Sequence, residues 1–132
     1  MSKKINGMKL LLAAVLMFTM FSCTKTTTIL ADNSPAVTGT VSFSKDIVPI
    51  LTKSCATTGC HSGSVAPNLS STLAYNALKS GNYISTGSPA TSLVYLWMTG
   101  KESATMPLGG QNNPSNINAI MLAWIKQGAN NN

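Results

Sequence analysis

The feature that most constrains this chain is the uneven distribution of its apolar residues. The chain has 132 residues, of which 44% are hydrophobic and only 9% are charged. Much of the apolar content is one run at the front, Leu10 to Phe21, which Lys3, Lys4 and Lys9 precede. A basic stretch followed by a short apolar run is typical of a secretory signal. The run is shorter than the roughly 20 residues of a membrane-spanning helix, so we do not expect a permanent transmembrane helix here.

The apolar run ends on Phe21-Ser22-Cys23. A small residue followed directly by Cys resembles the bacterial lipobox, and this resemblance implies that residues 1–22 are a lipoprotein signal and that Cys23 is lipidated. Ordinary signal cleavage that leaves Cys23 as a spare thiol is the alternative. Residues 23–41 are rich in Thr, Ser, Pro, Gly and Asn without periodicity, which predicts a flexible, lipid-anchored tether spanning about 25 Å. Residues 42–129 are then the folded domain.

The charges exclude one large class of partners. Without the signal, six Lys remain against Asp32, Asp46 and Glu102, which lowers the formal charge from +6 to +3. The lysines are scattered, Arg is absent and no aromatic residues alternate with them, so we expect no nucleic-acid binding. A moderate positive charge still favours encounters with an acidic partner.

Helical periodicity recurs through the domain, and no alternating strand pattern of useful length is present. Phe43, Ile47 and Leu51 have helical spacing, with Ser44 or Asp46 as the candidate N-cap. Pro49 favours the Asp46 cap, because Pro is tolerated only in a first turn.

Three further helices are expected. One runs over residues 71–79 and ends at Gly81 in the C′ position, and the next begins at Ser88-Pro89 and ends at Gly100. The last begins at the cap Ser115, ends at Gly128 and carries one apolar stripe, formed by Ile117, Ile120, Met121, Trp124 and Ile125. The domain is therefore predicted to be all-α, with three to four helices. About 87 residues are few for a core made by apolar packing alone, so a ligand or covalent link is expected to contribute.

The chemistry is concentrated in Cys55-Ala56-Thr57-Thr58-Gly59-Cys60-His61, where two thiols are followed at once by the only histidine of the chain. A haem held through its vinyl groups needs two cysteines at its edge and an imidazole placed under the iron by the same short turn. The usual attachment motif has two residues between the cysteines, whereas this chain has four. The loop must therefore bulge, and Gly59 can supply the unusual backbone angle.

Residues 42–63 (SFSKDIVPILTKSCATTGCHSG) resemble the opening of small bacterial c-type cytochrome domains, including variants with a longer spacer. The resemblance continues through residues 66–69, 87–93, 106–107 and 123–129, nearly the whole domain. It implies a cytochrome c-like fold in which three to four helices surround one covalently attached haem. It also implies crossed terminal helices, with Phe43, Ile47 and Leu51 against Ile120, Met121 and Trp124.

The resemblance assigns roles to five residues. Cys55 and Cys60 match the thioether cysteines, His61 the proximal iron ligand and Met106 the distal one. The Pro67 carbonyl matches the group that accepts the N–H of the proximal imidazole and orients the ring. Met98 is the rival ligand, but it is expected to pack on a helix.

His61 and Met106 together would fill both axial positions, so the resemblance implies electron transfer rather than catalysis. The expected partners are redox proteins of the cell envelope, reached from a lipid anchor that faces the periplasm of a Gram-negative bacterium. If Met106 did not bind, the open iron would suit a sensor or a peroxidase, although no second His and no Arg is present to assist.

Three alternatives involve no haem. A disulfide between Cys55 and Cys60 would make the protein a haem-free, stapled surface lipoprotein. Structural zinc would lack a fourth ligand. A Cys-His hydrolase is excluded because His61 is adjacent in sequence to Cys60 and too constrained to act as its base.

Overall fold

The computed structural model describes residues 36–102, 106–109 and 113–132 of the chain. Every regular element in these ranges is helical, and no strand occurs among them. The prediction of an all-α domain is therefore confirmed for this part of the chain. None of its helices is long and apolar enough to span a membrane. The predicted signal of residues 1–22, the predicted lipidation site Cys23 and residues 24–35 of the predicted tether lie outside the described residues.

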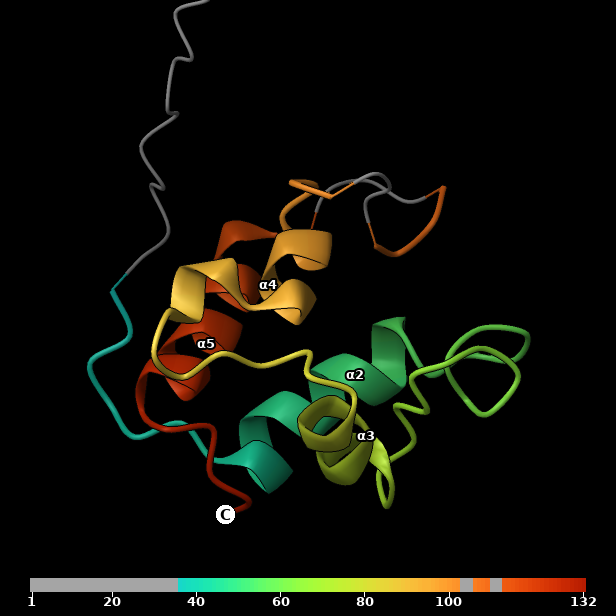
Figure 1. The fold of residues 1–132 in the computed structure, drawn as a ribbon, viewed down its shortest axis with the longest axis horizontal. Helices are drawn as coiled ribbons and strands as arrows, with labels where there is room; N and C mark the ends of the chain where they lie inside the picture. The colour runs from blue at the N-terminus through green and yellow to red at the C-terminus, as the bar shows by residue number, and fades with distance from the viewer. Residues whose placement is uncertain (1–35, 103–105, 110–112) are drawn as a thin grey trace, which may run out of the picture. The chain divides into compact units, whose positions relative to one another are not determined.

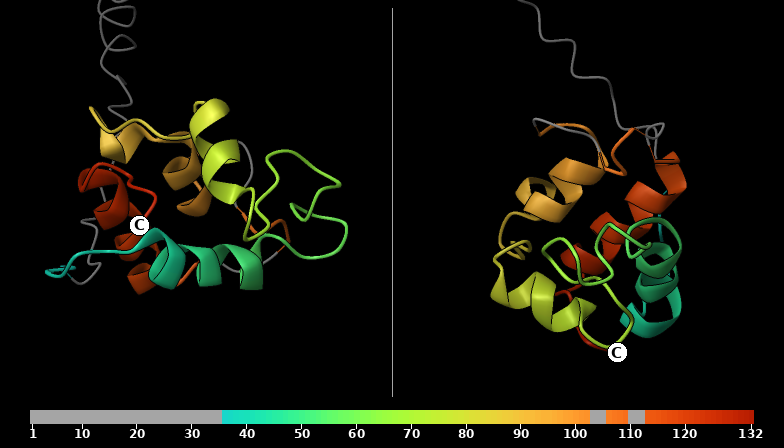
Figure 2. Two further views of the ribbon diagram at one scale, coloured as in Figure 1. Left: turned by 90° about the horizontal axis from the view of Figure 1, so that it is seen from below. Right: turned by 90° about the vertical axis from the view of Figure 1, so that its right-hand side faces the viewer.

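The helical elements follow one another with irregular connections between them (Figure 1). In chain order they are the π-helical turn η2 (Phe43–Ile47), α2 (Val48–Ser54), α3 (Ala74–Ser80), the 3₁₀ turn η3 (Pro89–Thr91), α4 (Leu93–Met98) and α5 (Ser115–Lys126). The turn η2 continues directly into α2. In the view of Figure 1, α4 lies above α2 and α3, and the left view of Figure 2 shows α2 apart from α3 and α4. The last helix, α5, contacts both η2 and α4.

The first helix is capped by Ser42. Its hydroxyl accepts a hydrogen bond from the Lys45 N–H at 3.3 Å, and its own N–H donates to Asp46 Oδ2 at 2.7 Å. The prediction of Ser44 or Asp46 as the cap is wrong, because Asp46 lies inside the first turn and returns a bond to the true cap. The wide π turn places Pro49 at the start of α2, where its missing N–H is tolerated.

The end of α3 differs in detail from the prediction. The left-handed residue after the helix is Asn82, with φ +56°, whereas Gly81 has φ −85°. Gly81 is required for a different reason: a Cβ there would collide with the Tyr83 ring and with the Ala77 carbonyl. The absent side chain of Gly81 therefore lets Tyr83 pack against the end of α3.

The helix predicted from Ser88 to Gly100 is interrupted at Ser92, so this prediction is only partly right. Ser92 has extended geometry (φ −60°, ψ +128°) between η3 and α4, and it is buried. Its hydroxyl accepts a hydrogen bond from the Ser85 N–H at 2.9 Å. A serine that bonds the backbone of another segment in this way competes with helix formation at its own position.

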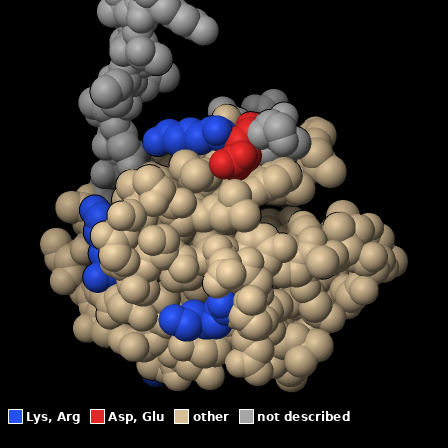
Figure 3. All heavy atoms as spheres, viewed as in Figure 1, with Lys and Arg blue, Asp and Glu red and all other residues tan. Residues whose placement is uncertain are grey.

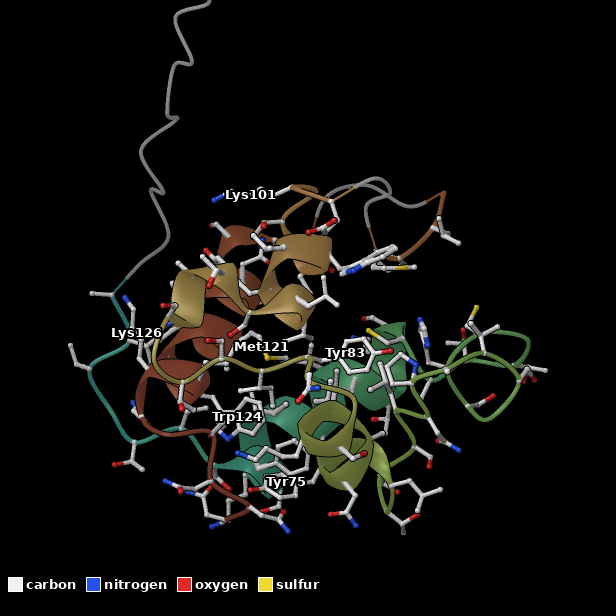
Figure 4. The ribbon with its side chains drawn as sticks, viewed as in Figure 1. Tyr75, Tyr83, Lys101, Met121, Trp124 and Lys126 are labelled. Carbon is white, nitrogen blue, oxygen red and sulfur yellow. The ribbon has the colours of Figure 1, made fainter. Side chains whose placement is uncertain are left out.

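The last helix carries the apolar stripe that the sequence predicts. Met121, Trp124 and Ile125 are buried in the core, and Ile117 and Ile120 are half-buried against it. The helix begins at Ser115 itself, which makes no capping bond, so the predicted cap is one residue off. The Phe43 ring of η2 lies 5.1 Å from Trp124 and 5.3 Å from Tyr75 between ring centroids. Figure 4 shows Tyr75 and Trp124 close together between α3 and α5.

Two polar side chains hold the start of the domain against its end. Gln127 Oε1 accepts from the Val41 N–H at 2.8 Å, and Gln127 Nε2 donates to the Gly39 carbonyl at 2.9 Å. Asn132 Oδ1 accepts from the Phe43 N–H at 2.9 Å. The Asn132 bond gives the N–H of Phe43, in the first turn of η2, an acceptor that the helix itself does not supply. The two Gln127 bonds hold residues 39–41 against the end of α5.

Candidate functional site

The cysteine-histidine turn begins where α2 ends. Cys55 is the C-cap of α2, and its N–H donates to the Leu51 carbonyl at 2.9 Å. The Cys60 N–H donates to the Thr57 carbonyl at 3.0 Å, and the His61 N–H donates to the Cys55 carbonyl at 3.1 Å. Gly59 has φ +81°, so it supplies the backbone angle that the longer spacer was expected to need. The bulged loop therefore returns His61 to the end of α2 beside Cys55.

The His61 ring is oriented by the loop that follows it. Its Nδ1 lies 3.0 Å from the Pro67 carbonyl and 3.3 Å from the Val65 carbonyl. Carbonyl oxygens can only accept, so both contacts require that Nδ1 carries the proton. The other ring nitrogen, Nε2, then has a free lone pair, which is the form in which a histidine binds a metal ion.

Both thiols of the turn are free in the structure, Cys55 half-buried and Cys60 exposed. Burial, and to a smaller extent the charge of Cys60, raises the pKa of the Cys55 thiol. A raised pKa keeps this thiol protonated at neutral pH, whereas a zinc ligand or a nucleophile requires the thiolate. The environment of Cys55 therefore does not activate it as a nucleophile or as a metal ligand.

A second loop carries Met106 from the other side of the domain. The Met106 N–H donates to the Trp97 carbonyl of α4 at 3.1 Å. Asn113 Nδ2 donates to the Met106 carbonyl at 2.7 Å and to the Met98 carbonyl at 3.0 Å. One carboxamide thus ties the backbone of Met106 to the end of α4. Nothing in the sequence pointed to Asn113, because it belongs to no motif and acts only through residues that the fold brings near it.

The two loops enclose a cavity of about 330 Å³. All five residues expected at the site line it: Cys55, Cys60, His61, Pro67 and Met106. The remaining lining comes from α2, α3, α4 and the loops between them, and most of it is apolar: Leu51, Ser54, Thr57, Gly59, Val65, Leu69, Leu78, Tyr83, Val94, Trp97, Met98, Pro107 and Leu108. The volume lies in the range of ligand sites, roughly 300–1,000 Å³. The fold therefore brings Met106 to the same cavity as the cysteine-histidine turn.

Several residues that line the cavity were not predicted as site residues from the sequence. Tyr83 and Leu78 come from α3 and the segment after it, where they had no motif to mark them. Met98, the rival ligand, is 5% exposed and belongs to the hydrophobic core, so the prediction that it packs is confirmed. Its side chain nevertheless reaches the cavity wall, as does that of Trp97.

The donor set of the cavity suits an organic metal complex better than a bare ion. Among the described residues, no three His, Cys, Asp or Glu side chains come together. The nitrogen and sulfur atoms at hand are one imidazole, two thiols and the thioethers of methionines, and no charged side chain lines the cavity. An apolar wall with an imidazole and a thioether fits a porphyrin that brings its own four nitrogen ligands.

Comparisons with known proteins add no assignment, since no family model, no curated protein and no solved structure matches this chain.

Proposed function

We propose that this protein is a monohaem c-type cytochrome that carries single electrons. The observation that carries the proposal is the shared cavity: Cys55, Cys60, His61 and Met106 all line it, although Met106 is 45 residues from His61 in the chain. Cys55, Cys60 and His61 share one turn, so the arrival of Met106 at the same apolar cavity is the independent observation that supports the proposal. The cytochrome c-like arrangement of the helices is part of the same proposal.

The residues of the chain have distinct roles in this reading. Cys55 and Cys60 would hold the haem through thioethers, and His61 would offer Nε2 to the iron. The Pro67 carbonyl, 3.0 Å from Nδ1, fixes the tautomer and the plane of the ring. Met106 would offer its thioether to the iron from a loop that Asn113 holds. The haem supplies a reversible one-electron couple, and a methionine ligand raises its reduction potential.

With both His61 and Met106 bound, the iron would have no coordination position for a substrate. The cavity also holds no arginine or second histidine to assist cleavage of an O–O bond. Its mostly apolar lining would keep the solvent rearrangement that accompanies electron transfer small. These features support a carrier rather than an enzyme or a gas sensor.

The carrier acts, in this proposal, in the bacterial cell envelope. The lipid on Cys23 and the tether of residues 23–41 hold the domain at a membrane on the periplasmic side of a Gram-negative cell. Its partners are redox proteins of the envelope and not nucleic acids. Palmitate labelling of the protein and of Cys23→Ser tests the anchor, and we expect the label to be lost in the variant.

Haem attachment is tested by producing the protein in cells that mature c-type cytochromes. A denaturing gel is stained for haem, and the intact mass is measured for the wild type, Cys55→Ser and Cys60→Ser. We expect the wild type to carry the mass of one haem and each variant to lose the double attachment. Cys23→Ser, the third cysteine of the chain, is the matched control and should keep the haem.

The alternatives give different results in the same samples. A colourless wild-type protein two hydrogens lighter than the reduced chain would contradict the proposal and indicate a disulfide between Cys55 and Cys60. A haem protein whose reduced form binds carbon monoxide at once would retain the attachment but show an open iron, and Met106 would then not be the ligand.

A further inference from the structure

The His61 ring has two backbone acceptors at the same nitrogen. Its Nδ1 lies 3.0 Å from the Pro67 carbonyl and 3.3 Å from the Val65 carbonyl. A neutral imidazole protonated at Nδ1 has a single hydrogen to donate there. The two carbonyls therefore share one N–H in a three-centre hydrogen bond. The resemblance to c-type cytochromes accounts for the Pro67 carbonyl alone.

The loop after His61 is tied to the cysteine-histidine turn by its own backbone. The Val65 N–H donates to the Cys60 carbonyl at 3.0 Å, and the Leu69 N–H donates to the His61 carbonyl at 2.7 Å. Gly63, two residues before Val65, has φ +133°, an angle that residues with a Cβ rarely adopt. These two bonds lie on either side of the acceptors along the chain, so the position of the Val65 carbonyl does not depend on the ring alone.

The acceptors at Nδ1 are neutral groups in surroundings without charge. Residues 54–78 contain no Lys, Arg, Asp or Glu, and no charged side chain of the described residues lines the cavity. Figure 3 shows no charged atoms, on the face in view, at the side where Figure 1 places the loop of residues 56–66. Each carbonyl therefore adds the partial negative charge of its oxygen at Nδ1 without a nearby carboxylate that would outweigh it.

We propose that Val65 is a second positioning residue for His61, whose carbonyl shares the Nδ1–H with Pro67 and increases electron donation from Nε2. The inference rests on the proposed function, since it takes Nε2 to face the iron. A hydrogen bond accepted from the Nδ1–H makes the imidazole a more basic ligand. A more basic ligand stabilises ferric iron more than ferrous iron, so the second acceptor lowers the reduction potential and opposes the increase that a methionine ligand gives.

An amide-to-ester substitution tests this acceptor and leaves every side chain in place. Replacing Ala66 by lactic acid in the semisynthetic full-length holoprotein turns the Val65 carbonyl into an ester carbonyl, which is a weaker hydrogen-bond acceptor. Ala66 is exposed, and its lost N–H makes no hydrogen bond among the described residues. The substitution therefore weakens one arm of the three-centre bond and keeps the Pro67 arm.

Two measurements report the change. We expect the ratio of ferrous to ferric protein at a fixed electrode potential to rise about twofold to threefold. The effect is small because the Val65 bond is the longer of the two and is exposed, so water competes for its acceptor. We also expect the Nδ1–H resonance of His61 in the ferrous protein to move upfield, which a purely structural role of the loop would not cause.

Replacing Gly63 by glycolic acid is the matched control. It makes the same backbone change in the same loop, at an amide whose N–H and carbonyl take part in no hydrogen bond among the described residues. We expect the ferrous-to-ferric ratio and the Nδ1–H resonance of this protein to match those of the wild type.

The outcomes separate this inference from the proposed function. A holoprotein in which the Ala66 ester leaves the ratio unchanged or lowers it, or in which the Gly63 ester gives the same shifts, overturns the role of Val65 and leaves the haem assignment standing. A protein without haem absorption overturns the proposed function and this inference together.

Discussion

The Asn113 side chain offers the sharpest test of how the second ligand is held. Replacing Asn113 by Ala removes the two hydrogen bonds from Nδ2 to the Met98 and Met106 carbonyls, 3.0 and 2.7 Å long. The thioether of Met106 itself is untouched. The substitution therefore weakens only the attachment of the ligand-bearing loop to the end of α4.

The size of the effect follows from the two bonds. Each hydrogen bond of this kind contributes about 0.5–1.5 kcal/mol net of the competition with water. Both carbonyls regain some water when released, so a loss of about 1–2 kcal/mol is expected for the closed loop. That loss raises the population of the form with Met106 detached from iron by about 5- to 30-fold.

In the proposed haem protein, carbon monoxide binding reports this population, because the gas would bind ferrous iron only after Met106 had left. We expect the binding rate of Asn113→Ala at low gas concentration to rise by the same factor of about 5 to 30. The charge-transfer band of methionine-bound ferric haem should weaken in parallel. The matched control is Asn76→Ala, which removes the same group from an exposed site on α3.

The reasoning fails if Asn113→Ala binds carbon monoxide at the rate of the wild type. A lowered unfolding midpoint with an unchanged binding rate would likewise show that Asn113 serves stability alone and does not position the ligand.

Four further predictions concern stability. Gly59→Ala should cost about 1 kcal/mol in chemical denaturation, because an added Cβ has free space around it but φ is +81°. Gly81→Ala should cost about 1–3 kcal/mol and change the Soret circular dichroism, since it displaces Tyr83 from the cavity wall; an unchanged spectrum would argue against this packing. Asn132→Ala should lower the unfolding free energy by about 1 kcal/mol, because the Phe43 N–H loses its acceptor. Without haem, the apolar lining of the cavity would lose the apolar surface that covers it, so far-UV circular dichroism should show a poorly folded apoprotein without a cooperative melt.

Local patterns in the sequence predicted much of the helical architecture. The stripe from Ile117 to Ile125 specified the buried face of α5, because helical spacing places those residues on one side whatever the helix packs against. The interruption at Ser92 and the cap at Ser42 were missed. The interruption depends on the hydrogen bond between Ser85 and the Ser92 hydroxyl, and the cap depends on the hydrogen bond between Ser42 and Asp46. Serine and aspartate side chains can also bond other backbone groups near them, so the sequence alone does not select these bonds.

The sequence by itself determined the all-α class and the turn that places Cys55, Cys60 and His61 together, because these features need only periodicity and a loop of a few residues. Only the tertiary structure decided that Met106 lines the same cavity and that Asn113 holds its loop. Met106 is 45 residues from His61, and Asn113 is 15 residues from Met98, and the loops that carry Met106 and Asn113 have no periodic pattern. Their meeting depends on how α2, α4 and α5 pack, which follows from the shapes of many buried side chains together.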